Sequence, residues 1–162
     1  MDMISLKPLD QEHIDEAAHF VGLVMNPEER EYAYRTLVFH FGCRNSGYDD
    51  GRLYYMWQKD GSICGLAGLH RYVWGPMENA WLGWFGIAQN LRRKGFGRIV
   101  MQSVENRAVK VGIRKLFIET YSSPEFAAAR AFYENVGFAL SGKIPDYMPD
   151  GAALLVYYKR LW

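Results

Sequence analysis

The first quarter of the chain spaces its hydrophobic residues as helices do, after a short alternating segment. Ile4 to Pro8 alternates and predicts a first strand. Asp10 could cap the helix that follows, whose apolar face would hold Ile14, Ala17, Ala18 and Val21. A second helix is predicted over residues 27–41, with Asn26 as its cap and a proline in its first turn. Residues 42–51 are polar and contain glycine, which predicts a loop.

The middle of the chain has the pattern of an antiparallel meander. Strands are predicted over residues 52–57 and 62–74, joined by Asp60-Gly61, which is a strong hairpin signal. Gly75-Pro76 would end the second strand, and a third strand is predicted over residues 79–87.

Strands and helices then alternate. A helix is predicted to end at Gly112, with an inner face made of Val100, Val104, Ala108 and Val111. A strand is predicted at 115–120, a helix from Pro124 to Val136, and two last strands at 138–144 and 152–158.

The strand and helix order over residues 79–136 requires one parallel pair of neighbouring strands, because a crossover helix returns the chain in the same direction. The other strands are expected to pair antiparallel. The predicted fold is therefore α/β (α+β), with a mixed, mainly antiparallel central sheet and helices on both faces. A length of 162 residues suits a single domain, 1–162.

Composition narrows the classes of partner. A hydrophobic fraction of 49% and an aromatic fraction of 15% predict an ordered, packed domain. The net charge of +1 gives the chain no strong positive field that would attract nucleic acid. No stretch is apolar for long enough to cross a membrane, so we expect neither nucleic acid nor a membrane as a partner. Cys43 and Cys64 fit no disulfide framework or metal site, and no secretory leader is visible. We therefore expect a cytoplasmic protein without a metal.

The segment Arg92-Arg93-Lys94-Gly95-Phe96-Gly97 carries the strongest chemical signal. It joins a strand to a helix, its glycines allow a tight turn near a ligand, and the helix start offers unpaired N–H groups. This predicts a pyrophosphate site and a nucleotide-containing cofactor. A dinucleotide fingerprint would need glycine or alanine at Val100, and an ATP-type loop would need Gly-Lys-Ser/Thr. The alternative is a short turn into a helix with surface arginines.

From about Trp81 to Phe138 the chain resembles the GNAT superfamily of acyl-CoA-dependent N-acyltransferases. The phosphate loop of that superfamily reads Arg/Gln-x-x-Gly-x-Gly/Ala, and the strand before it ends in an apolar-x-apolar step. A later motif reads aromatic/Leu-Tyr-x-x-x-Gly-Phe. The matching residues here are Arg92, Gly95 and Gly97, then Phe85 and Ile87, then Phe132, Tyr133, Gly137 and Phe138.

The resemblance implies acetyl-CoA as a co-substrate. Backbone N–H groups of Arg93 to Arg98 would hold its pyrophosphate, and the backbone of residues 85–87 would pair with its pantetheine arm. Gly83 and Gly86 suit such a close approach, or alternatively a tightly packed sheet. The implied cofactor-binding residues are Phe85, Gly86, Ile87, Arg92, Arg93, Lys94, Gly95, Phe96, Gly97, Arg98 and Ser123. Ser123 is included because many members have an asparagine where Phe126 stands, and Ser122 or Ser123 could supply the polar contact.

Two residues are the catalytic candidates. The family motif implies that Tyr133 protonates the leaving thiolate, whereas a lone tyrosine is otherwise more often a core aromatic. Glu119 lies in an otherwise apolar strand, where burial would make its carboxylate a better general base. A structural ion pair is the alternative for Glu119, and water could relay the proton instead.

The acceptor is expected to be a primary amine of a small molecule or a peptide. His70, Tyr32 and Tyr147 are weaker candidates for its binding, while His13, His19 and His40 are expected at surface or partly buried helix positions. The predicted function is an N-acetyltransferase that works by direct transfer. The alternatives are a non-catalytic acyl-CoA sensor on the same fold and an unrelated phosphate-ligand protein. Dimers are frequent in the family, so a homodimer is one expected assembly.

Overall fold

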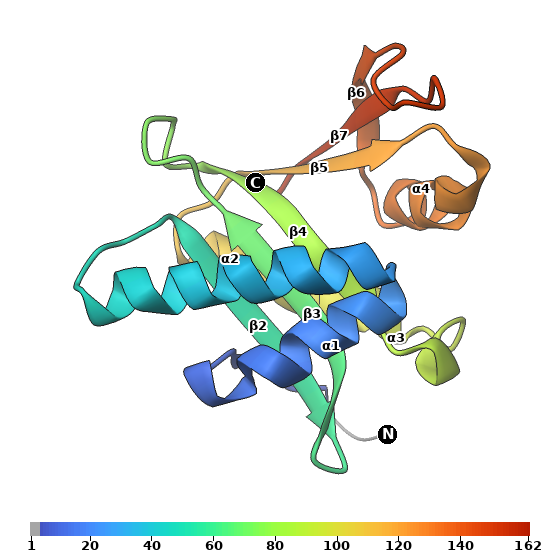
Figure 1. Cartoon of the computed structure of the whole chain (residues 1–162). Coiled ribbons are helices and arrows are strands. Elements are labelled where there is room, and N and C mark those ends of the chain that lie inside the picture. Colours follow the sequence, from blue (N-terminus) through green and yellow to red (C-terminus); the bar gives the residue numbers. More distant parts are fainter. Residues whose placement is uncertain (1–3) are drawn as a thin grey trace.

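The computed structural model describes residues 4–162, which form a seven-stranded sheet in the order β1-β2-β3-β4-β5-β7-β6 (Figure 1). The strands are β1 (Lys7–Pro8), β2 (Arg52–Lys59), β3 (Ser62–His70), β4 (Asn79–Ile87), β5 (Lys115–Tyr121), β6 (Ala139–Ile144) and β7 (Leu154–Arg160). The helices are α1 (Ile14–Val24), α2 (Pro27–Asn45), α3 (Phe96–Lys110) and α4 (Ala127–Asn135), with 3₁₀ turns at Gln11–His13, Gln89–Leu91 and Pro124–Phe126.

The sheet has a hydrophobic core on each face. Helices α1 and α2 cover one face, where Val21 and Leu37 pack with Leu66 of β3. Helix α3 covers the other face, where Val104 packs with Leu116 of β5, and α4 borders the same core. Strands β4 and β5 are parallel, and all other neighbouring strands among residues 4–162 are antiparallel. The predicted mixed sheet with helices on both faces is confirmed.

Several predicted element ends are wrong, including those of β2, which runs to Lys59, and β7, which covers Leu154–Arg160. Helix α2 runs to Asn45 instead of stopping at residue 41, because Gly42 continues the helix and the first left-handed glycine is Gly47, with a φ of 74°. Strand β3 ends at His70 rather than at residue 74, because the chain leaves the sheet in a turn closed by the Gly75 N–H and the Tyr72 carbonyl, 3.0 Å apart. Strand β1 is limited to Lys7–Pro8.

The two predicted helix caps differ. Asn26 caps α2 as expected, since its Oδ1 accepts from the Glu29 N–H at 2.9 Å. Asp10 makes no side-chain cap; its carboxylate binds His13 Nδ1 at 2.6 Å.

Candidate active site

Strands β4 and β5 pair at their first residues and then diverge. Their pairing covers only Asn79, Ala80 and Trp81 of β4. Beyond it β5 pairs with β7 alone, and residues 83–87 of β4 pair with β3 alone (Figure 1). One edge of β4 therefore has no strand neighbour. Such an edge can take an extended ligand as an additional strand.

A bulge in β4 lies at this divergence. The register with β3 shifts between Leu66 and Gly68, and Trp84 has a left-handed φ of 45°. This backbone conformation is costly for a residue with a side chain, so neighbouring contacts must hold it. Trp84 Nε1 donates to Glu29 Oε2 at 3.1 Å, and the indole stacks on Tyr54 with ring centroids 6.0 Å apart. Helix α2 thereby fixes the bulge that redirects β4.

The loop after β4 presents backbone N–H groups at the start of α3. Gly95, with a φ of 84°, is the N-cap residue, and Arg93 has a φ of 60°. The first turn of α3 contains no acidic residue, so the positive end of the helix dipole is not offset there. Its first N–H groups have no acceptor within the helix. These features fit a bound pyrophosphate.

Several basic side chains of this loop bind the protein's own backbone. Arg92 donates from Nε to the Ile87 carbonyl at 3.0 Å and from Nη2 to a carbonyl at the end of α1 at 3.1 Å. Lys94 and Arg98 also donate to backbone carbonyls, at 2.9 and 3.2 Å. Within residues 4–162, Arg93 makes no side-chain hydrogen bond or ion pair. Arg92 therefore shapes the loop, and Arg93 has its guanidinium available for a ligand.

The two glycines of β4 serve different purposes. A Cβ atom at Gly86 would lie 2.7 Å from Val24 Cγ2 of α1, so packing requires glycine there. A Cβ atom at Gly83 would meet nothing within 4 Å. The tight-packing alternative thus holds for Gly86, while Gly83 leaves open space beside the bulge.

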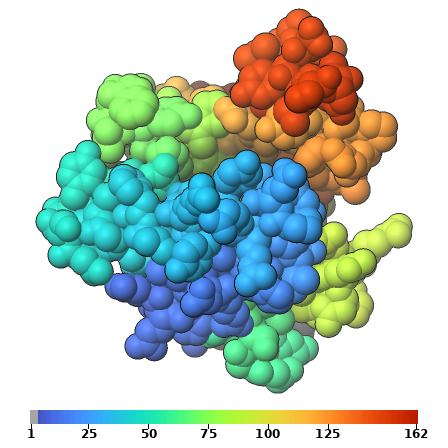
Figure 2. Space-filling model, in the orientation of Figure 1, coloured from blue at the N-terminus to red at the C-terminus, as the bar shows by residue number. Residues whose placement is uncertain are grey.

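Tyr133 lies on α4, on the far side of the divergence. Its ring packs on Phe132, Phe138 and Tyr157, with ring centroids 5.8, 6.2 and 6.5 Å away. Burial raises the pKa of Tyr133 to about 12, so the hydroxyl is protonated at neutral pH. Within the part of the chain that the structure describes, this hydroxyl has no hydrogen-bond partner. In Figure 2 a notch separates the orange atoms of α4 from the yellow-green loop after β4.

Glu119 is exposed, which corrects the expectation that the apolar strand buries it. Its neighbours Leu116, Ile118 and Thr120 point into the α3 core, and the alternation of β5 sends Glu119 to the opposite face. Tyr133 packs on Tyr157, which belongs to the α3 core. The two catalytic candidates therefore lie on opposite faces of the sheet, with the divergence of β4 and β5 between them.

The loop between β5 and α4 is held by a residue that sequence reasoning missed. Arg130 Nη1 donates to the Tyr121 carbonyl at 2.6 Å and to the Ser123 carbonyl at 2.9 Å. Ser122 Oγ accepts from the Ala153 N–H at 2.8 Å, so that hydroxyl is engaged. Ser123 makes no side-chain cap for the turn that follows it. Of the two predicted serines, Ser123 is the one with an uncommitted hydroxyl in the described chain.

The three acceptor candidates are only partly brought together. Tyr147, in the loop between β6 and β7, stacks on Tyr121 of β5 with ring centroids 6.3 Å apart. His70 lies at the end of β3, edge-on to Tyr72 at 5.1 Å, and burial lowers its pKa. Tyr32 is 55% exposed on α2. The structure thus places Tyr147 beside β5 and His70 at the opposite end of the same face.

Two further groups escaped prediction. Glu29 of α2 holds Trp84 at the bulge, and Tyr121 follows Glu119 on the same face of β5. The alternation of β5 could have revealed Tyr121. His40, expected at a surface or partly buried position, is fully buried, and its Nδ1 lies 2.9 Å from Asp50 Oδ1.

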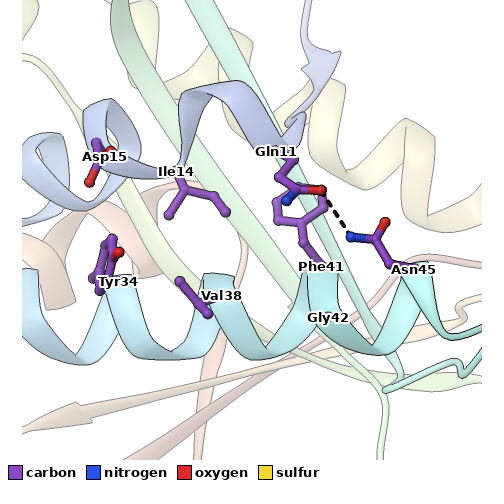
Figure 3. Close-up of a pocket in the computed structure, with 8 residues that line it drawn as sticks. All are labelled: Gln11, Ile14, Asp15, Tyr34, Val38, Phe41, Gly42 and Asn45. Atoms are coloured by element: carbon purple, nitrogen blue, oxygen red, sulfur yellow. Dashed lines mark hydrogen bonds between the residues drawn. The ribbon is translucent and has the colours of Figure 1, made fainter.

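The described surface also has a groove that lies away from these residues. Its volume is about 370 Å³, and it lies between α1 and α2, lined by Gln11, Ile14, Asp15, Tyr34, Val38, Phe41, Gly42 and Asn45 (Figure 3). Asn45 Nδ2 donates to Gln11 Oε1 across it at 3.0 Å. No residue of β4, β5 or α3 lines this groove, so it is not the site of the predicted chemistry.

Within residues 4–162, no cluster of three or more His, Cys, Asp or Glu side chains could hold a metal ion. No helix in the same range has the length and hydropathy needed to span a bilayer.

Solved acetyltransferases share this fold. A crystal structure of a GNAT-family acetyltransferase from Desulfovibrio desulfuricans superposes with a TM-score of 0.82 at 20% identity, covering 98% of this chain and 99% of that one. An aminoglycoside 6'-N-acetyltransferase complexed with coenzyme A superposes with a TM-score of 0.76 at 11% identity, covering 98% and 97%. At these identities the likeness shows the fold alone.

Comparison of the sequence with known proteins also identifies acetyltransferases. Residues 18–138 match the Acetyltransferase (GNAT) family, and the chain belongs to that family. The uncharacterized N-acetyltransferase YdgE of Bacillus subtilis (strain 168) is 24% identical over 117 residues, which cover 70% of this chain and 69% of YdgE. The chain is thus an acetyl-CoA-dependent N-acetyltransferase, as predicted.

Proposed function

We propose that this enzyme transfers the acetyl group directly from acetyl-CoA to a primary amine while both are bound. The observation that carries the proposal is the divergence of β4 from β5 beside the start of α3. The free β4 edge at residues 85–87 would pair with the pantetheine arm. N–H groups of Arg93 to Arg98 would hold the pyrophosphate, with added charge from the Arg93 guanidinium. Ser123 would supply a polar contact from the α4 side.

Counted from the ammonium ion, the nitrogen must lose two protons and the leaving sulfur must gain one, so one proton is released to solvent overall. The amine nitrogen bonds to the thioester carbon, the carbon–sulfur bond breaks, and coenzyme A leaves as a thiolate. Glu119, or a water beside it, accepts the proton that the ammonium must lose. Tyr133 donates its proton to the thiolate and regains one from solvent. Holding both reactants in one cleft would contribute much of the rate.

Calorimetry with acetyl-CoA, followed by measurement of thiol release with a panel of amines, tests this proposal. We expect saturable binding and thiol release that depends on an amine. A protein without saturable acetyl-CoA binding would contradict the proposal at its first step. Binding without amine-dependent release across the panel would instead indicate an acyl-CoA-binding module on the same fold.

A further inference from the structure

A row of aromatic side chains crosses the sheet on the face that carries α2. The strand registers place His70, Trp81, Phe117 and Tyr158 directly opposite one another across β3, β4, β5 and β7. Ring centroids lie 5.0 Å apart between Trp81 and Phe117, and 5.5 Å apart between Phe117 and Tyr158. All four side chains are partly exposed. Helices α1 and α2 leave this part of β5 and β7 uncovered (Figure 1).

The row extends beyond β3 into the turn that follows it. Tyr72 lies 6.1 Å from Trp81, and it stacks on Trp74 at 5.3 Å. Trp74 is 82% exposed. Large aromatic rings rarely stand in such an exposed, contiguous arrangement on a monomer surface without a binding role.

One carboxylate lies on the strand that carries Phe117, and a second lies at the bulge of β4. Glu119 follows Phe117 by two residues on the same face, at a strand distance of about 7 Å. Glu29 reaches the region from α2, bound to the Trp84 indole. Tyr121 follows Glu119 by two residues on the same face of β5, and its pKa is raised first by burial and further by Tyr147, Glu119 and Glu29.

No cation among residues 4–162 forms an ion pair with either carboxylate. Two basic residues of this face have partners of their own: Lys115 Nζ lies 3.4 Å from Glu78 Oε1, and Arg52 Nη1 lies 3.2 Å from Asp50 Oδ2. Neither Glu29 nor Glu119 is therefore committed to an ion pair within the described chain. An ammonium group is the cation that the reaction requires.

We propose that the acceptor is an arylalkylamine, meaning a primary amine joined by a short alkyl chain to an aromatic ring. The ring would lie on Trp81 and Phe117, and the ammonium group would lie between Glu29 and Glu119. With a two- or three-carbon chain, the distance from the ring centre to the ammonium nitrogen is comparable to the roughly 7 Å that separates Phe117 from Glu119 along the strand. A polyamine would need carboxylates spread along its length, and a polyhydroxylated amine would need polar walls. An unbroken row of aromatic rings supplies neither. The inference rests on the proposed function for its reaction, but not for the binding itself.

Calorimetry on the protein loaded with coenzyme A tests the binding, with 2-phenylethylamine, ethylamine, spermidine and 2-phenylethanol as probes. We expect 2-phenylethylamine to bind about tenfold or more tightly than ethylamine, because the ring adds aromatic contact, and more tightly than 2-phenylethanol, which has no charge. Tighter binding of spermidine, or equal binding of ethylamine and 2-phenylethylamine, would overturn the inference.

Variants locate the site. Phe117→Ala and Tyr72→Ala should each weaken 2-phenylethylamine several-fold and leave ethylamine unchanged; Tyr72 is included because Phe117 also contributes to folding. Glu29→Gln should weaken 2-phenylethylamine and leave 2-phenylethanol unchanged. Tyr34→Ala is the matched control, since Tyr34 is an exposed aromatic in the groove between α1 and α2. Equal effects of Tyr34→Ala and Tyr72→Ala would contradict the site.

Product analysis separates the two proposals. If 2-phenylethylamine binds as expected but yields no N-acetyl product with acetyl-CoA, the proposed reaction fails and the binding site stands. If spermidine or ethylamine is acetylated while 2-phenylethylamine neither binds nor reacts, the acceptor class is wrong and the acetyl transfer stands.

Discussion

Phe85 of β4 and Phe132 of α4 stack with ring centroids 5.5 Å apart and ring planes at 14°, so they join the two sides of the β4–β5 divergence. Gly97, in the first turn of α3, completes this contact. A Cβ atom at Gly97 would lie 3.2 Å from Phe132 Cε2. The distance between the start of α3 and α4 is therefore set by a glycine.

Gly97→Val should push Phe132 away and widen the predicted cofactor site. Overpacking of this kind costs about 1–3 kcal/mol of unfolding free energy, and acetyl-CoA binding should weaken with it. Gly42→Ala is the control, because a Cβ atom at Gly42 of α2 would meet nothing within 4 Å. That variant should gain up to about 1 kcal/mol and bind acetyl-CoA normally. Urea unfolding and calorimetry measure both effects; normal acetyl-CoA binding by Gly97→Val would contradict the packing argument.

Tyr133→Phe should separate chemistry from folding. The change keeps the ring contacts with Phe132 and Phe138 and removes a hydroxyl that has no partner within residues 4–162, so stability should change little. If Tyr133 is the acid, kcat should fall by about 10²-fold while the Kd for acetyl-CoA is unchanged.

Tyr157→Phe provides the contrasting control. The Tyr157 hydroxyl donates to Glu134 Oε1 at 2.9 Å, so its loss should cost about 1 kcal/mol of stability and leave kcat intact. An undiminished kcat in Tyr133→Phe would show that another group protonates the thiolate.

The pH profile provides a separate test of Tyr133. A general acid works only while protonated, and a pKa of about 12 keeps the Tyr133 hydroxyl protonated well above neutral pH. The rate should therefore show no alkaline decline that is due to Tyr133 between pH 7 and 10. A decline of kcat in that range that disappears in Tyr133→Phe would contradict the raised pKa. Stopped measurements of thiol release across this range provide the data.

Glu119→Gln should lower kcat/KM by about tenfold or more, either because the base is lost or because the ammonium loses a charge partner. Since Glu119 is exposed and forms no ion pair among the described residues, the midpoint of unfolding should be unchanged. Glu12→Gln is a matched exposed control in the turn before α1. Unchanged kcat/KM in Glu119→Gln would assign the proton to water alone.

The order of the elements could be predicted from sequence because each depends on local patterns. The hairpin between β2 and β3, the helical spacing of Val100, Val104 and Ala108, and the crossover between β4 and β5 all follow from local pattern and connection. Val111, predicted on the same helix face, is instead 43% exposed at the C-terminal end of α3. Element ends were less predictable: Gly42 looks like a stop but continues α2, because nothing in the surroundings forces it out of the helix.

The chemistry of the site depended on contacts between distant residues. Glu119 was expected to be buried because its sequence neighbours are apolar, yet the divergence of β4 leaves that face of β5 open. Glu29 is 55 residues from Trp84 in sequence, and no local pattern links them. The basic loop is visible in the sequence, but only the three-dimensional contacts distinguish Arg92, which binds backbone carbonyls, from Arg93.

Arg92 and Arg93 should differ in their effect on stability when each is changed to alanine. Arg92 ties the Ile87 carbonyl of β4 to the Val24 carbonyl of α1, so Arg92→Ala should lower the unfolding free energy by about 1–3 kcal/mol and weaken acetyl-CoA binding through a displaced loop. Arg93→Ala removes a guanidinium without a partner in the described chain, so stability should be unchanged. Its acetyl-CoA Kd should rise about tenfold at low salt, with a smaller difference from the wild type as salt screens the pyrophosphate charge. Unfolding curves and calorimetry at two salt concentrations distinguish the roles.

If Arg93→Ala binds acetyl-CoA as the wild type does, then the pyrophosphate is held by backbone N–H groups alone. If Arg92→Ala is as stable as the wild type, then the two carbonyl bonds do not hold the loop.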